Sequence, residues 1–141
     1  MAASRGHRIL PHTADLIIEA WAPTRTACME EAVLGLVGAF ADTSNADAAE
    51  PVALALDPAR DDDLLVALLE EVLYLVEVLG VVPSAAAVTE RDDGGLGGFF
   101  DVVRVGQVEE VGAAPKAITR GDLRFGPRPD GTWSCRVTVD V

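Results

Sequence analysis

Cysteine is scarce in this chain of 141 residues, which contains only Cys28 and Cys135. The two lie far apart in the sequence and form no paired spacing of the kind found in zinc sites. The sequence therefore indicates neither a zinc knuckle nor a disulfide scaffold. Both cysteines fall in apolar patterns, so we expect them to be buried free thiols.

The chain also lacks a long apolar run that is free of charge. Its most apolar stretch, residues 64–82, is interrupted by Glu70, Glu71 and Glu77, which excludes a membrane-spanning helix. Residues 1–10 contain no hydrophobic core of the kind that a secretory signal needs. We therefore expect a soluble cytoplasmic protein with no membrane partner.

Basic side chains are few, and the formal net charge is −12 with a pI of about 4.4. A negative surface repels phosphate backbones, so we expect no direct binding of nucleic acid by the protein alone. The negative electrostatic potential of the protein favours a cation or a basic protein as the partner. Hydrophobic residues make up 50% of the chain, which is enough for a packed core and excludes a disordered protein.

No motif in the chain makes a self-sufficient active site. There is no nucleophile elbow, no glycine loop that would hold a phosphate and no paired His-Glu helix motif. His12 is a candidate general base or ligand, because imidazole titrates near neutral pH. The alternative, and the commoner role of a histidine beside threonine and aspartate, is a hydrogen bond that fixes a turn.

The order of the apolar patterns predicts an α+β fold. Strands are expected at residues 8–10, 16–21, 52–56, 85–89, 99–105, 116–125 and 132–141, and helices after Thr24 and from Asp61. These elements predict a single domain over residues 1–141. We expect a two-layer sandwich of mixed or antiparallel sheet with two main helices.

The second helix has an unusually wide apolar face. Residues at helical spacing from Leu65 to Leu79 form its core stripe, and Leu64, Val66 and Leu73 widen the apolar arc. This width predicts that the helix also touches a partner.

Lys116 is the only lysine, and hairpin arithmetic places it beside the end of the chain. Residues 126–131, Gly-Pro-Arg-Pro-Asp-Gly, favour a turn, because proline fixes φ near the value that a turn needs and Asp-Gly accepts positive φ. If the flanking strands fold back symmetrically about this turn, Lys116 lies opposite Val141 and next to Asp140. An ammonium group, a side-chain carboxylate and the carboxylate of the last residue then share one edge.

Carboxylates at strand ends form a candidate metal site. Asp15 begins one hydrophobic strand and Asp140 ends another. If these strands are neighbours, their carboxylates join that of Val141 in an oxygen-rich pocket. Calcium, magnesium and manganese all favour such ligands. The alternative is that these carboxylates are simply solvated.

Four segments of the chain resemble the archease family. They are Pro11-His12-Thr13-Ala14-Asp15-Leu16, Phe40-Ala41-Asp42-Thr43, Lys116-Ala117-Ile118-Thr119 and Val139-Asp140-Val141, in the family's order and over nearly the whole chain. The resemblance implies that Asp15, Asp140 and Val141 hold a divalent metal ion and that Lys116 is functionally important. Arg120-Gly121 stand where family members usually carry Tyr-His or a similar pair, so the surface that contacts a partner differs here.

Two functions in tRNA processing follow from this resemblance. Archeases are small acidic proteins that assist the GTP-dependent tRNA-splicing ligase by promoting its guanylylation and turnover, which implies a non-enzymatic activator. The alternative is a chaperone-like binding module for a tRNA-modifying enzyme such as a tRNA methyltransferase, with a structural metal. A stand-alone metal-dependent phosphoesterase is disfavoured, because the chain offers no nucleophile and no second metal cluster.

Overall fold

The strands form three antiparallel sheets in the computed structural model, which describes residues 4–12 and 15–141 and the side chains of all of these except residues 11 and 12. The four-stranded sheet has the order β1 (Gly6–His12), β2 (Asp15–Ala22), β9 (Trp133–Asp140), β8 (Ala117–Pro127). The three-stranded sheet has the order β4 (Val52–Leu56), β6 (Leu96–Arg104), β5 (Val81–Glu90). A short ribbon joins β3 (Ala41–Asp42) to β7 (Glu109–Glu110).

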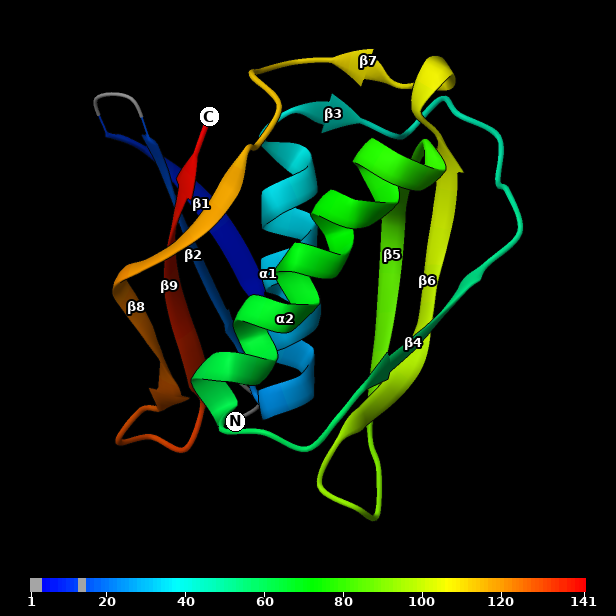
Figure 1. Ribbon diagram of the computed structural model, residues 1–141. Coiled ribbons are helices and arrows are strands. Elements are labelled where there is room, and N and C mark those ends of the chain that lie inside the picture. Colours follow the sequence, from blue (N-terminus) through cyan, green and yellow to red (C-terminus); the bar gives the residue numbers. More distant parts are fainter. Residues whose placement is uncertain (1–3, 13–14) are drawn as a thin grey trace.

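Two helices lie between the two larger sheets (Figure 1). They are α1 (Arg25–Gly38) and α2 (Asp61–Tyr74), and α2 continues directly into the π-helical turn η1 (Leu75–Leu79). A 3-10 turn, η2 (Val105–Gln107), follows β6. The predicted α+β class with two main helices on antiparallel strands is confirmed. The expected two-layer arrangement differs, because the helices are apolar on opposite sides and form a layer with a sheet on each side of it. The sequence patterns did not predict how the strands divide into separate sheets.

Helix α1 begins where the sequence predicted. The Thr24 side chain accepts a hydrogen bond of 3.2 Å from the backbone N–H of Ala27, which satisfies one of the free amides of the first turn. The helix contacts β2 on one side and β5 on the other. Its buried side chains include Met29, Val33 and Leu36, and full burial of each contributes about 1.5–3 kcal/mol.

Helix α2 uses its wide apolar face inside the protein. Leu64 and Val66 are buried and so do not support the prediction that this helix touches a partner, which stays a prediction. A helix enclosed between two sheets needs apolar residues on most of its circumference. The prediction that Leu79 belongs to the core stripe was wrong, because the π-helical turn changes the residue spacing and leaves this side chain 51% exposed.

Strands β8 and β9 form the final hairpin, and two departures from symmetric pairing cancel each other along it. Symmetric folding pairs Phe125 with Thr132, but Phe125 pairs with Cys135, a difference of three residues. Strand β8 then has an irregularity between Thr119 and Arg124, and beyond it Ala117 pairs with Asp140, as symmetric folding requires. The extra residues in β8 therefore return Lys116 to the predicted place.

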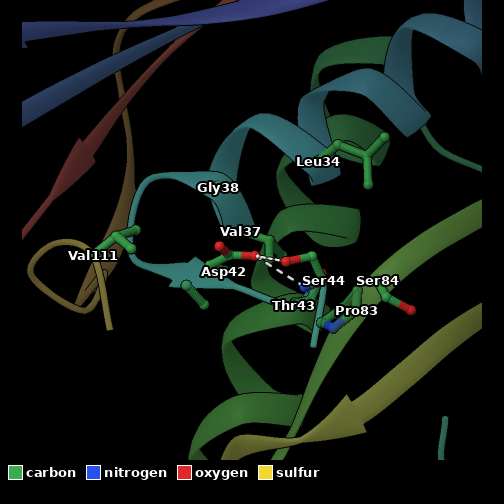
Figure 2. Close-up of a pocket in the computed structure, with 10 residues that line it drawn as sticks. Leu34, Val37, Gly38, Asp42, Thr43, Ser44, Pro83, Ser84 and Val111 are labelled. Carbon is green, nitrogen blue, oxygen red and sulfur yellow. Dashed lines mark hydrogen bonds between the residues drawn. The ribbon is translucent and has the colours of Figure 1, made fainter. Parts of the chain in front are cut away.

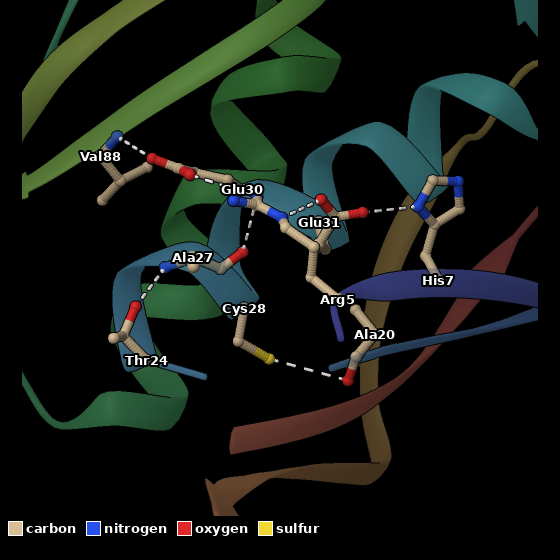
Figure 3. A network of polar contacts seen from close by, with 9 residues as sticks. All are labelled: Arg5, His7, Ala20, Thr24, Ala27, Cys28, Glu30, Glu31 and Val88. Carbon is tan, nitrogen blue, oxygen red and sulfur yellow. Dashed lines mark hydrogen bonds and ion pairs between the residues drawn. The ribbon is translucent and has the colours of Figure 1, made fainter. Parts of the chain in front are cut away.

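A polar network ties β1 to α1 and β5 (Figure 3). Glu31 is only 7% exposed, and its carboxylate accepts a hydrogen bond from Arg5 Nε at 2.5 Å and lies 3.0 Å from His7 Nδ1. Glu30 accepts hydrogen bonds from Arg5 at 3.3 Å and from the backbone N–H of Val88 at 2.8 Å. Hydrogen bonds to charged groups contribute about 1.5–3 kcal/mol each, so this cluster is structural and holds the first strand on the helix.

The two cysteines lie in the interior of the protein. Cys28 and Cys135 are both buried and free, as expected. Within residues 4–12 and 15–141, no helix has the length and apolar character needed to cross a membrane.

Candidate functional site

A row of four residues crosses the four-stranded sheet at the end where β9 finishes. His12 on β1 pairs with Asp15 on β2, Asp15 pairs with Asp140 on β9, and Asp140 pairs with Ala117 on β8. Residues that lie directly opposite in antiparallel strands have Cβ atoms about 4.5–5.5 Å apart. The sheet thus brings together two carboxylates from near opposite ends of the sequence.

The carboxyl group of Asp15 acts on that of Asp140. The pKa of Asp140 is raised, first by the neighbouring carboxyl group of Asp15, then by desolvation and by the negative charge of Asp15. The positive charge of Lys116 acts in the opposite direction and lowers the same pKa. The row is therefore a place where negative charge is crowded and a cation is favourable.

Lys116 lies at the same end of the sheet, as the hairpin arithmetic predicted. Its backbone N–H donates a hydrogen bond of 2.7 Å to the carbonyl oxygen of Asp140. The residue is exposed, so its ammonium group is available to a partner. Val141 directly follows Asp140 and is half-buried. The structure thus gathers Lys116, Asp15, Asp140 and Val141, whereas the side chain of His12 lies outside the described part of the chain.

The donor atoms gathered here suit a hard cation. Carboxylate oxygens are the ligands that calcium, magnesium and manganese prefer, and the site contains no thiolate ligand of the kind found in many zinc sites. Over the described ranges, no three side chains of His, Cys, Asp or Glu are grouped to hold a metal ion. A cation bound between Asp15 and Asp140 would therefore need the carboxylate of Val141, backbone oxygens or water to complete its coordination.

A cavity of about 380 Å³ lies where α1 ends (Figure 2). Asp42 lines it, and its carboxylate accepts hydrogen bonds from the backbone N–H and the hydroxyl group of Ser44 at 2.9 and 2.6 Å. These hydrogen bonds lower the pKa of Asp42, so the cavity presents a carboxylate that stays charged. Asp42 was not among the site residues predicted from the sequence, although aspartate two residues before serine is typical of a side-chain turn.

The segment that contains Asp42 lies at the same end of the molecule as the carboxylate row. The backbone N–H of Val111 donates a hydrogen bond of 3.0 Å to the carbonyl oxygen of Phe40, and residues 111–116 lead from there to Lys116. Figure 1 shows β3 and the C-terminus together at this end. Asp42, Lys116 and the carboxylate row, which lie far apart in the sequence, are therefore at the same end of the molecule.

Comparison with known proteins identifies the family. Residues 7–141 match the model of the Archease protein family (MTH1598/TM1083). The chain is 47% identical over 138 residues to "Probable protein archease" of Mycobacterium tuberculosis, an alignment that covers 98% of this chain and 76% of that protein. It is 28% identical to "Protein archease" of Pyrococcus furiosus, over 92% of this chain and 94% of that protein.

A solved structure agrees at the level of the fold. The solution structure of Methanobacterium thermoautotrophicum protein 1598 superposes with a TM-score of 0.73 at 24% identity, and the alignment covers 96% of this chain and 99% of that one. The family match over nearly all of the chain and the relative at 47% identity lead to the same conclusion. The chain belongs to the archease family.

Proposed function

We propose that this protein is a metal-binding accessory factor that activates a GTP-dependent tRNA-splicing ligase by promoting its guanylylation and multiple turnover. The proposal rests on the family and on one observation, the row that sets Asp15 opposite Asp140 with Lys116 beside them. Two buried free thiols suit a reducing compartment, which supports action in the cytoplasm.

Each residue of the site has a distinct task in this proposal. Asp15, Asp140 and the carboxylate of Val141 hold calcium, magnesium or manganese through oxygen ligands. When bound, the cation supplies positive charge that reduces the repulsion between phosphate oxygens during nucleotide transfer. Lys116 is exposed and makes a point-charge contact to a phosphate group or to a carboxylate of the ligase.

The acidic surface explains why the protein acts through a partner. A net charge of −12 keeps the protein away from free RNA, yet favours approach to the basic cleft of an enzyme that handles phosphates. Electrostatic attraction of this kind raises association rates and weakens as salt is added. The protein therefore brings its site to the RNA only in the presence of the ligase.

The first test compares the protein alone with the protein added to its ligase. Alone with GTP, divalent metal and cleaved tRNA halves, it is expected to form no ligated product. Added in trace amounts to its cognate ligase, it is expected to raise the rate of guanylylation and to sustain repeated rounds of ligation, measured as labelled enzyme and as joined RNA. Ligation by the protein alone, or no effect on the ligase, would contradict the proposal.

A second candidate function is a chaperone-like module for a tRNA-modifying enzyme such as a tRNA methyltransferase, with a structural metal. The observation that favours it is a set of exposed apolar side chains where α2 passes into η1, Tyr74, Val78 and Leu79, which are 47%, 61% and 51% exposed. A methylation assay with the tRNA-modifying enzyme, run beside the guanylylation assay, separates the two functions. A protein that changes methylation but not guanylylation supports this second candidate.

A further inference from the structure

A second polar site lies on the four-stranded sheet, away from the carboxylate row. It is a cavity of about 160 Å³ lined by Glu19, Ala20, Arg124, Arg128, Ser134, Cys135 and Arg136. Arg136 precedes Asp140 by four residues on β9, which places it about 13 Å along the strand at about 3.3 Å per residue. The two sites are therefore separate, and this inference does not rest on the proposed function.

The cavity gathers positive charge in a strongly acidic protein. Three of the ten arginines in the chain line it, against a single glutamate. Glu19 lies 4.0 Å from Arg136 and 3.2 Å from Arg8, so it is shared between two arginines and does not neutralise the lining of the cavity. Among the described side chains, neither Arg124 nor Arg128 has an acidic partner within ion-pair distance.

The strand register places two of these arginines directly opposite each other. Arg124 on β8 pairs with Arg136 on β9, and Arg136 pairs in turn with Glu19 on β2. Like charges at directly opposite positions of an antiparallel pair are destabilising. An anion held between the two guanidinium groups removes this repulsion, so the arrangement is suited to a ligand rather than to stability alone.

Arg128 approaches the same place from the loop that follows β8. Its backbone N–H donates a hydrogen bond of 2.6 Å to the carbonyl oxygen of Thr132, which fixes the loop beside the cavity.

We propose that this cavity binds a phosphate group, either as free inorganic phosphate or as the terminal phosphate of a small phosphate monoester. Guanidinium groups donate paired hydrogen bonds that match the oxygens of phosphate, and the hydroxyl group of Ser134 adds a further donor. Pockets for drug-sized ligands measure about 300–1,000 Å³, so this smaller cavity selects a single anionic group and leaves any attached organic part outside.

Calorimetric titration at low ionic strength tests this site with inorganic phosphate, adenosine 5′-monophosphate and adenosine as separate probes. We expect both phosphate-bearing probes to bind and adenosine not to bind. Arg124→Gln is expected to weaken phosphate binding by about tenfold, because a hydrogen bond to a charged group is lost. Equal affinity for the two phosphate probes would assign the site to the phosphate group itself, and tighter binding of the nucleotide would assign it to a monoester.

Arg104→Gln is the matched control, since Arg104 is an exposed arginine at the end of β6 and does not line the cavity. It is expected to bind phosphate as the unchanged protein does. Arg128→Gln provides a second test on a loop residue, where the strand pairing is not disturbed. No binding of phosphate, or an equal loss of binding in the Arg104→Gln control, would overturn the proposal.

Discussion

Saturating calcium, magnesium or manganese is expected to stabilise the protein, and Asp15→Asn and Asp140→Asn are each expected to abolish the gain. A ligand that binds only the folded state adds about 2.7 kcal/mol to the free energy of unfolding at about 100 times its dissociation constant. Without the cation, the two variants should be as stable as the unchanged protein or more stable. Each substitution removes one of two like charges that the strand register sets opposite each other.

Thermal unfolding with each cation in turn measures both effects. Asp101→Asn is the matched control, because Asp101 is an exposed aspartate on β6 in the other large sheet. A residue added after Val141 is expected to weaken the cation effect, whereas the same addition before Met1 is not. Equal cation shifts in the unchanged protein and both aspartate variants would remove the metal site from this account.

Lys116→Ala is expected to lose the stimulation of the ligase while the protein keeps its fold. The side chain is exposed, and the hydrogen bond to Asp140 uses the backbone N–H of Lys116, which alanine retains. The free energy of unfolding should therefore change by no more than about 0.5 kcal/mol, as for other surface substitutions. The rate of ligase guanylylation should fall to the level seen without the protein.

Lys116→Arg separates charge from geometry at this position. Arginine keeps the positive charge but replaces a compact ammonium group with a planar fork, so partial stimulation indicates a specific point contact. Arg104→Ala is the control for the loss of one positive charge elsewhere on the surface. Full stimulation by Lys116→Ala would show that the lysine does not contact the ligase or its substrate.

The position of Lys116 beside Asp140 could be predicted from the sequence, because strand patterns and turn residues are local signals. Alternation in β9 and the turn residues after β8 were enough to bring Lys116 beside Asp140. The prediction for Lys116 was nevertheless right only because two departures from a symmetric hairpin cancel each other. The hydrophobic pattern predicts neither the three-residue shift in register near the turn nor the irregularity in β8. Their effects on the register cancel at Ala117.

The features that the sequence did not predict depend on contacts between distant segments. The pairing of β2 with β9 sets Asp15 opposite Asp140. The strand patterns left this pairing open, because no local pattern specifies which strands become neighbours, and only the family resemblance implied it. The same pairing, together with that of β8, gathers the arginines of the second cavity. The exposure of Leu79 was missed because a π-helical turn changes the spacing on which helical periodicity depends.

The most direct test of the central claim measures multiple turnover of the cognate ligase with trace amounts of Asp15→Asn/Asp140→Asn in the presence of GTP and divalent metal. The double variant keeps Lys116 and the fold but removes both side-chain carboxylates of the row. We expect the unchanged protein to sustain repeated ligation, whereas the folded double variant should leave the ligase at its unassisted rate. Stimulation by the double variant equal to that of the unchanged protein would contradict the claim that the carboxylate row activates the ligase.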